Sequence, residues 1–410
     1  MMEERIRVRE HIPADVPPAT ARAVEEAIGR LKVELSPSLR QLAFTGNQIE
    51  LRNLVGSVRL GNGSVLEVEP KVGSDNNWTE AAVQLLTDKT RIAVTGSQRS
   101  KLGPPRGDLS TAVAFEYARR LERAISQEGP IQIYEHHKLT SRRPNGHLNV
   151  GKWVRSALLD PAIFPIERDD LTVANDFTRG LSIVASNFRR SVRDAGLLSR
   201  LRLLETAVIP GHPTPIYVNP SVANRTLPPQ WSKYRPAWDI ASAVLKNRSV
   251  VGDPGRSIGL EVAIEPWPLL ETLLGRVLIA VARTPGLHLQ VDNKGKHPLL
   301  THADTTATSV IPDGTLRRFG KVVATFEAKY TLPGETPREK HVYQALATAA
   351  AVHSPLSVIV YPGDEPVKKY EVTGFGGTPV HLVTVGLKMY SYSRTNGDEQ
   401  RAELIRQILT

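Results

Sequence analysis

The stretch that decides the fold of this chain reads VIPDG at residues 310–314 and, after a short turn, VVATFEAKY at residues 322–330. The pattern predicts a strand start and then an apolar strand, joined by a hairpin that turns near residues 319–321. Side chains alternate along a strand, so Glu327 and Lys329 should share one face, roughly 7 Å apart. Asp313 precedes the neighbouring strand and can approach Glu327 from the side. We therefore expect two acids and one ammonium on one face of a C-terminal sheet.

Two carboxylates and an ammonium in this arrangement suit the hydrolysis of a phosphodiester. That reaction needs hard oxygen ligands for Mg²⁺ and a group that orients or polarises the attacking water. Asp313 and Glu327 would repel each other unless a cation lay between them, so a divalent ion is their natural partner. Lys329 can then reach the water or the phosphate. The alternative, an exposed edge strand, is disfavoured by the apolar residues at 322–326.

Two further side chains are candidates for the same site. Glu271 borders the apolar stripe of a helix predicted at 268–283, where it can supply a third metal ligand or, alternatively, lie in solvent. Gln344 lies on a small-residue helix that can pack flat on the sheet, so its amide can meet the phosphate. A rival triplet at 292–294 (DNK) lies in a polar run that indicates a turn. The sequence has no GxxxxGK[ST] motif, so a nucleotide-driven step needs a partner.

The positive charge of the chain is clustered. Its net charge is +10 and its pI is about 9.7. Arginines and lysines gather at 138–155 and 179–202, as expected of a surface that contacts a phosphate backbone. The alternative is a basic surface that serves solubility alone. The residues predicted to contact nucleic acid are Lys138, Arg142, Arg143, Arg189, Arg190 and Arg193.

Cysteine is missing from the sequence, which excludes disulfides, thiolate catalysis and Cys-based zinc sites. No apolar run reaches the roughly 20 residues needed to span a bilayer. The first residues lack an apolar signal segment. We therefore expect a cytoplasmic protein without a membrane partner.

The 410 residues divide into three predicted segments. Residues 1–75 read as a β-rich module with a leading helix at 20–31, and residues 76–250 as a mostly helical region. Helices and strands alternate over 265–410, which predicts an α/β domain. The expected fold class is thus α+β or α/β and multidomain. Further helices are predicted at about 78–90, 111–127, 174–190, 193–205, 236–247, 268–283, 337–352 and 397–409, and strands at 48–52, 55–60, 64–70, 130–139, 287–291, 308–311, 315–318, 321–328, 356–361 and 379–385.

Short blocks of this sequence resemble known families. IPD at 311–313 and EAK at 327–329 are similar to the ligand pattern of Mg²⁺-dependent nucleases of the PD-(D/E)xK type, whose domain is restriction-endonuclease-like. From about 45 to 350, ordered blocks resemble the McrC family, the nuclease subunit of the McrBC modification-dependent restriction system. Glu327 stands where that family commonly has Asp, and Leu54 where it has Tyr; neither change removes a ligand. The blocks are NLVGSV (53–58), GNG (61–63), LEVEPK (66–71), NGHL (145–148), DLTVAN (170–175), KYRPA (233–237), LLE (269–271), IPD (311–313), FEAKY (326–330) and VYQAL (342–346).

The McrC resemblance implies partners and a division of labour. In such systems a McrB-like AAA+ GTPase forms a hexamer, and the McrC-like subunit docks its N-terminal part, including a finger-like β element, into the ring and stimulates GTP hydrolysis. Residues 1–250 would serve docking, and residues 265–410 would form the nuclease. The implied cofactor is Mg²⁺, with Mn²⁺ as the alternative, and GTP would act only through the partner. The implied substrate is double-stranded DNA, expected to be modified.

Three functions stay open at this point. The first is an endonuclease subunit of a GTP-driven restriction complex, in which Asp313, Glu327 and Glu271 hold Mg²⁺ and Lys329 and Gln344 act on water and phosphate. The second is a stand-alone PD-(D/E)xK nuclease in repair or DNA-end processing, which would cut with Mg²⁺ and no partner. The third is a non-catalytic adaptor that activates a GTPase ring. Which hairpin would enter the ring, and whether the basic segments face ring or DNA, is not settled by the sequence.

Overall fold

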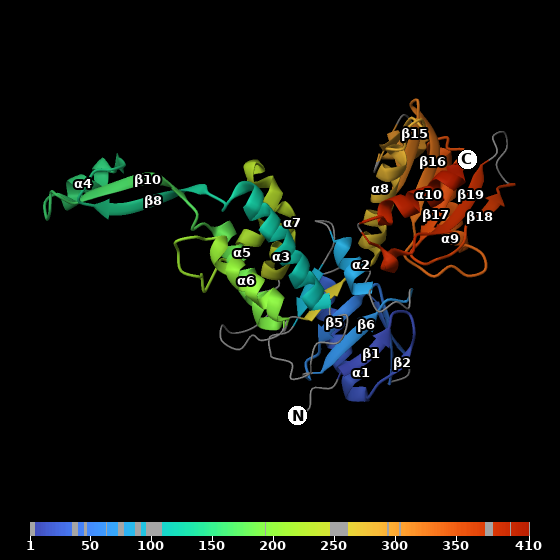
Figure 1. The fold of residues 1–410 in the computed structure, drawn as a ribbon, viewed down its shortest axis with the longest axis horizontal. Helices are drawn as coiled ribbons and strands as arrows, with labels where there is room; N and C mark the ends of the chain where they lie inside the picture. Colours follow the sequence, from blue (N-terminus) through green and yellow to red (C-terminus); the bar gives the residue numbers. More distant parts are fainter. Residues whose placement is uncertain are drawn as a thin grey trace. The chain divides into compact units, whose positions relative to one another are not determined.

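The chain forms two compact units (Figure 1). Unit 1 contains residues 1–113 and 256–410, and unit 2 contains residues 114–255. α2 (Trp78–Gln84) and β7 (Ile92–Thr95), which fall in the middle segment of the sequence-based division, belong to unit 1. In the described part of the chain no helix is both long and apolar enough to cross a membrane. The computed structural model describes residues 5–34, 40–44, 47–62, 64–72, 78–86, 92–95, 109–192, 194–246, 261–292, 295–302, 305–373, 380–393 and 395–409.

The N-terminal part of unit 1 is built on a five-stranded sheet, and a second sheet has the order β2-β4-β3. The leading helix expected at 20–31 is confirmed as α1 (Pro18–Glu34). Its apolar side chains, such as Val24 and Ile28, are buried against Leu51 and Leu66 of the strands. The first sheet has the order β1 (Arg5–Arg9), β6 (Val65–Glu69), β5 (Val55–Arg59), β11 (Glu261–Ile264) and β7, and the second contains β2 (Ala14–Asp15), β4 (Gln48–Arg52) and β3 (Arg40–Phe44).

Strand β11 joins the two halves of unit 1. It lies between β5 and β7 in the N-terminal sheet although about 160 residues separate it from β7 in the sequence. Gly56 makes this pairing possible, because it has φ +116° and a Cβ there would collide with the Val262 carbonyl oxygen. The four-residue strands β7 and β11 were not predicted, since neither shows a clear apolar period.

The C-terminal part of unit 1 is a six-stranded mixed sheet. Its three central pairings are the antiparallel β15–β16 hairpin and the parallel pairs β16–β17 and β17–β19. Helix α8 (Trp267–Ala282) packs on β12, β15 and β16, while α9 (Glu339–Ala351) packs on β16 and β17. The strands in sheet order are β12 (Leu289–Asp292), β15 (Gly314–Arg318), β16 (Lys321–Ala328), β17 (Leu356–Tyr361), β19 (His381–Gly386) and β18 (Lys368–Glu371).

Most C-terminal predictions are confirmed, because this part has long periodic elements. The helix expected at 397–409 is α10 (Gly397–Leu409), and the strand expected at 356–361 is β17. The strand expected at 308–311 overlaps β14 (Thr305–Val310), which the structure pairs with β13 (His297–His302) in a hairpin. Strand β13 was not predicted because its sequence, HPLLTH, shows no alternation of apolar and polar residues and most of its residues are exposed.

Unit 2 has a helical body, as the sequence predicted. Its core contains the fully buried aromatic rings of Tyr117, Phe177, Phe188 and Tyr234. The Tyr117 hydroxyl donates to the Leu181 carbonyl oxygen at 2.7 Å. The body contains α5 (Asp176–Ser191), α6 (Ala195–Ala207), α7 (Arg235–Lys246), most of α3 (Leu109–Glu128), and two 3-10 helices, η1 (Pro220–Asn224) and η2 (Pro229–Tyr234).

A β arm extends away from this helical body (Figure 1). We call residues 133–172 the arm; it contains β8 (Ile133–Ser141), β9 (His147–Leu148), α4 (Val150–Ser156) and β10 (Phe164–Thr172). No residue of β8 or α4 is buried, and Ile166 is the one buried residue of β10. Only β8 was predicted. Without a core of its own, the arm gives a weak apolar period in the sequence.

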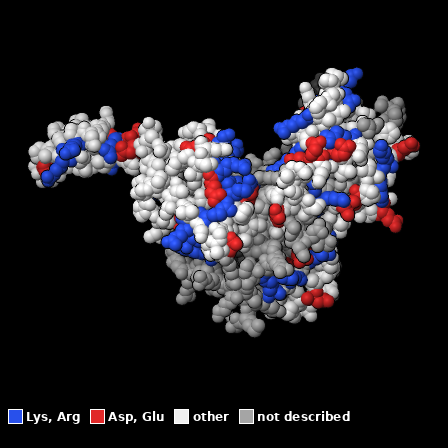
Figure 2. Space-filling model, viewed as in Figure 1, with Lys and Arg blue, Asp and Glu red and all other residues white. Residues whose placement is uncertain are grey.

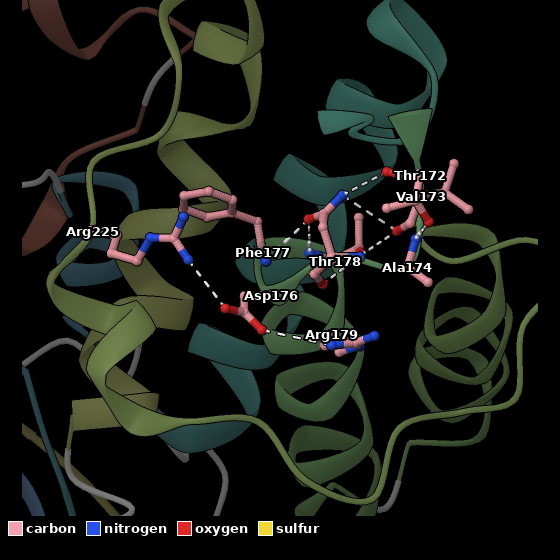
Figure 3. Close-up of polar contacts among 9 residues, drawn as sticks. Thr172, Val173, Ala174, Asp176, Phe177, Thr178, Arg179 and Arg225 are labelled. Carbon is pink, nitrogen blue, oxygen red and sulfur yellow. Dashed lines mark hydrogen bonds and ion pairs between the residues drawn. The ribbon is translucent and has the colours of Figure 1, made fainter. Parts of the chain in front are cut away.

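One buried asparagine ties the arm to helix α5. Asn175 is fully buried, and its Oδ1 accepts from the amides of Phe177 and Thr178, both at 3.1 Å. Its Nδ2 donates to the carbonyl oxygens of Ile131 (2.9 Å) and Thr172 (3.2 Å), next to the two ends of the arm. Figure 3 shows Thr172, Phe177 and Thr178 gathered at this joint. The same side chain thus caps a helix and holds both strands.

Replacing Asn175 by alanine should destabilise unit 2. The variant loses an N-cap, which typically costs about 1 kcal/mol, and leaves buried carbonyl groups without a donor, at about 1–3 kcal/mol each. We expect the free energy of unfolding, measured by urea denaturation, to fall by about 2 kcal/mol or more. The matched control is Asn149→Ala, which removes the cap of the exposed helix α4. Equal losses in the two variants would contradict the role of the joint.

Candidate active site

Asp313 and Glu327 come together at the open end of the β15–β16 hairpin. Gly314 pairs with Phe326, so Asp313 falls opposite Glu327 one step further along the register. Residues directly opposite in an antiparallel pair project to the same face. The Asp313 Oδ2 accepts from the backbone amide of Ala328 at 2.8 Å, which fixes this carboxylate beside the strand end. Glu327 is buried, with 1% of its surface exposed.

Three side chains satisfy both oxygens of the Glu327 carboxylate. Lys329 Nζ and Gln344 Nε2 donate to Oε2 at 3.0 and 2.9 Å. Thr348 Oγ1 donates to Oε1 at 2.9 Å. The structure thus brings the predicted Lys329 and Gln344 to Glu327. Thr348 was missed, although it lies four residues after Gln344 and therefore on the same helix face.

Small residues allow these contacts. Ala345 is fully buried in a cluster with Ile359 and Tyr361, so α9 lies close to the sheet. The backbone of α9 also contacts the sheet directly, because Ser357 Oγ donates to the Ala345 carbonyl oxygen at 3.0 Å. On the other strand, a Cβ on Gly314 would collide with the Leu278 side chain of α8. Glycine after Asp313 therefore lets α8 pack against the hairpin.

The environment of Asp313 favours its neutral form. Burial, and then the negative charge of Glu327, raise the pKa of Asp313 to about 6. The Ala328 amide opposes this shift, Glu271 adds to it, and Lys329 opposes it. A cation bound beside Asp313 would stabilise the charged form of its carboxylate.

The donor set suits a hard divalent ion. Mg²⁺ usually takes one or two carboxylates and keeps several waters, and the acids of Asp313 and Glu327 meet that requirement. In the part of the chain that the structure describes, no group of three His, Asp or Glu side chains is gathered for a metal. The charge of Glu271, on α8, contributes to the raised pKa of Asp313. Its role as a third metal ligand stays a prediction.

Positive charges lie close to His341, in the first turn of α9: Arg338 at the N-cap of the helix and Lys340 within it. Burial, and then the charges of Lys329, Arg338 and Lys340, lower the pKa of His341 to about 4. The His341 Nδ1 is buried and has no hydrogen-bond partner among the described residues. Arg338, Lys340 and His341 were not predicted from the sequence, since they lie beyond an irregular loop that hides the proximity of His341 to Lys329.

The predicted nucleic-acid residues do not form one uniform basic face. Lys138 lies 3.4 Å from Glu167, and Arg189 pairs with Glu205. Figure 2 shows residues of both charge signs along the arm. Surface ion pairs are weak, so DNA contact by these residues stays a prediction. Arg142, Arg143 and Arg190 are exposed, and Arg193 lies outside the described residues.

The rival DNK triplet takes part in a different contact. Asp292 ends strand β12, and its Oδ2 accepts from Arg317 Nε at 3.0 Å. Residues 293 and 294 lie outside the described residues. Asp292 therefore offers a matched control for the acids of the candidate site.

Most of this chain matches one known protein family. The family described as "McrBC 5-methylcytosine restriction system component" matches residues 49–362. The chain belongs to this McrBC family. The match confirms the resemblance drawn from the sequence blocks, and it includes Asp313, Glu327, Lys329 and Gln344. The search of curated proteins gave no match.

Two solved structures are similar to this chain at low sequence identity. One chain of the refined half-complex from a tetradecameric assembly of Thermococcus gammatolerans McrB AAA+ hexamers with bound McrC is 16% identical, with a TM-score of 0.61; the alignment covers 99% of this chain and 100% of that one. A chain of the Thermococcus gammatolerans McrBC complex is 15% identical, with a TM-score of 0.44 and 68% of this chain and 89% of that chain covered. The first similarity supports the fold of the whole McrBC-family chain.

Asp313→Asn should stabilise the protein at neutral pH in metal-free buffer. Because the pKa of Asp313 is raised from 3.8 to about 6, the folded state binds a proton more readily than the unfolded chain between these values. The free energy of unfolding therefore falls as the pH rises through this window. Asparagine keeps an acceptor for the Ala328 amide and removes the charge. We expect a gain of up to about 3 kcal/mol at pH 7.5.

Thermal or urea unfolding with a chelator, at pH 7.5 and below about pH 3, measures this gain. It should vanish at the acid end, where both states of wild-type Asp313 are protonated. Asp292→Asn serves as the control and should not be stabilised. A gain that is independent of pH would contradict the environment described for Asp313.

Proposed function

We propose that this chain is the Mg²⁺-dependent endonuclease subunit of a McrBC-type restriction complex driven by a partner GTPase. The observation that carries the proposal is the register that sets Asp313 opposite Glu327, with Lys329 3.0 Å from the Glu327 carboxylate. Asp313, Glu327 and the Ala328 carbonyl would hold the metal, with Glu271 as a further ligand. When bound, the ion would polarise the phosphate and lower the pKa of the attacking water.

The protein side chains have separate tasks in this proposal. Thr348 and Gln344 orient the Glu327 carboxylate through its two oxygens. Lys329 orients the attacking water or neutralises the phosphate. The positive charges of Arg338 and Lys340, close enough to act on His341, would attract the DNA backbone. The mixed sheet with α8 and α9 packed on it supports a PD-(D/E)xK domain for residues 265–410.

The arm is our candidate for the element that docks on the partner ring. The partner would be a McrB-like AAA+ GTPase hexamer, as family membership and the McrB-bound McrC of Thermococcus gammatolerans suggest. Leu158 and Leu159 are 90% and 93% exposed, and Val150 and Val154 are each 58% exposed. Apolar side chains gathered on a surface mark protein-binding sites. Stimulation of the partner's GTP hydrolysis, modified double-stranded DNA as substrate, and a cytoplasmic location complete the proposal.

A stand-alone nuclease is the second candidate, because every residue of the candidate site lies within unit 1. Such an enzyme would cut DNA with Mg²⁺ alone. Cleavage assays of the isolated chain with and without the partner GTPase and GTP separate the two functions. Cutting that needs neither would favour the second.

Asp313→Ala and Lys329→Ala should each lower DNA cleavage by at least about 100-fold in the reconstituted complex, since each removes a group from the transition state. Binding to the partner, measured by size-exclusion chromatography, and stimulation of its GTPase should be retained. Asp292→Ala is the matched control and should cut at the wild-type rate. Unchanged cleavage by both site variants would end the assignment of this site.

Charging the tip of the arm should uncouple the two subunits. The double variant Leu158→Glu and Leu159→Glu should weaken partner binding by about 10-fold or more, because two carboxylates would be desolvated at the interface. GTPase stimulation should fall in parallel, while the thermal unfolding curve stays unchanged. Ile216→Glu, at a residue 92% exposed in the same unit but outside the arm, is the control. Equal binding by all three proteins would exclude the arm.

A further inference from the structure

A buried ion pair lies between the N-terminal sheet and the end of the candidate catalytic strand, within unit 1. Glu10 is fully buried and follows β1, and the Lys71 side chain is 2% exposed and follows β6. The Lys71 Nζ lies 3.8 Å from the Glu10 Oε1. The same Oε1 accepts from the backbone amide of Asn53 at 2.7 Å. None of these groups takes part in the chemistry proposed above.

Glu10 and Lys71 contact Tyr330 at three places: its carbonyl oxygen, its ring and its hydroxyl. The Lys71 Nζ donates to the Tyr330 carbonyl oxygen at 2.9 Å and lies 4.0 Å from the centre of its ring. The Tyr330 hydroxyl donates to the Glu10 Oε2 at 2.8 Å and also lies 2.8 Å from the Tyr390 hydroxyl. Main chain, ring face and hydroxyl of one residue are therefore held by two charges from the N-terminal module.

These contacts with Tyr330 lie next to the candidate active site. Tyr330 follows Lys329, whose Nζ donates to Glu327. Beyond Ala328, where β16 ends, the ladder continues among the described residues only through the Lys329 amide, which donates to the Val360 carbonyl oxygen at 2.8 Å. Tyr330 is therefore outside the regular pairing of the sheet, and it is held by its contacts with Glu10, Lys71 and Tyr390.

Such a pair is costly to bury. Burial raises the pKa of Glu10 and lowers the pKa of Lys71 to about 8. Replacing a buried ion pair by apolar residues is often neutral or stabilising, so its presence is weak support for a purely stabilising role. The contacts indicate instead that Glu10 and Lys71 fix one conformation of the strand end at Tyr330.

We propose that Glu10 and Lys71 are positioning residues of the nuclease centre, which hold the backbone at Tyr330 and thereby aim Lys329 at Glu327. The inference rests on the proposed nuclease function for its catalytic consequence. It also gives the N-terminal module a direct route to the active site, because a shift of β1 or β6 would move the two charges that hold the strand end.

The test compares Lys71→Met with the double variant Glu10→Gln and Lys71→Met in the reconstituted complex. Lys71→Met should lower kcat for DNA cleavage by about 10- to 100-fold, as expected for a small misplacement of a reacting group, and change KM by less than about 2-fold. Hydrogen exchange of the amides at 329–331 should become at least about 10-fold faster. The double variant removes the unpaired carboxylate and should recover the melting temperature of Lys71→Met toward wild type without recovering kcat.

Lys321→Met, at an exposed lysine that begins the same strand, is the matched control and should match wild type in kcat, exchange and melting temperature. Recovery of kcat together with the melting temperature in the double variant would overturn the proposal, because it would show a structural role alone. Unchanged exchange at 329–331 in Lys71→Met would overturn it too. If wild-type protein does not cut DNA, the proposed function fails, and the exchange data still decide whether the pair positions the strand.

Discussion

The site depends on the antiparallel register of β15 and β16. That register sets Asp313 opposite Glu327, where burial and then the charge of Glu327 raise the pKa of Asp313. The hairpin can keep this arrangement because both acids have fixed donors: the Ala328 amide for Asp313, and Lys329 with Gln344 and Thr348 for Glu327. A cation bound between Asp313 and Glu327 would lower the repulsion between their carboxylates.

The rest of unit 1 supports that hairpin from two sides. The small residues of α9 let Gln344 and Thr348 reach Glu327. From the other side, charges of the N-terminal module hold Tyr330, the residue after Lys329. Unit 2 is inserted between the two halves, and β11 completes the N-terminal sheet directly after this insertion. A chain built in this way can carry the arm on unit 2 while strands from before and after the insertion still pair in one sheet of unit 1.

The elements that were predicted correctly share a physical property: they bury one face along a regular period. The helix with Leu270, Leu273 and Leu274 and the strand with Phe326 are of this kind, and both are buried as expected. The missed elements have either few residues, as in β11, or little contact with a core, as in β10 of the arm. A hydrophobic period is visible in a sequence only where a long element meets one core.

The sequence by itself determined the chemistry of the candidate site: its acids, its ammonium and the spacing that puts Glu327 and Lys329 on one strand face. It did so because these residues are close together in the chain, and strand geometry fixes local neighbours. Only the tertiary structure decided that Thr348 and His341 join this site, and that Glu10 and Lys71 hold its edge. Those contacts join residues up to 320 positions apart, and no local pattern encodes the packing of separate elements.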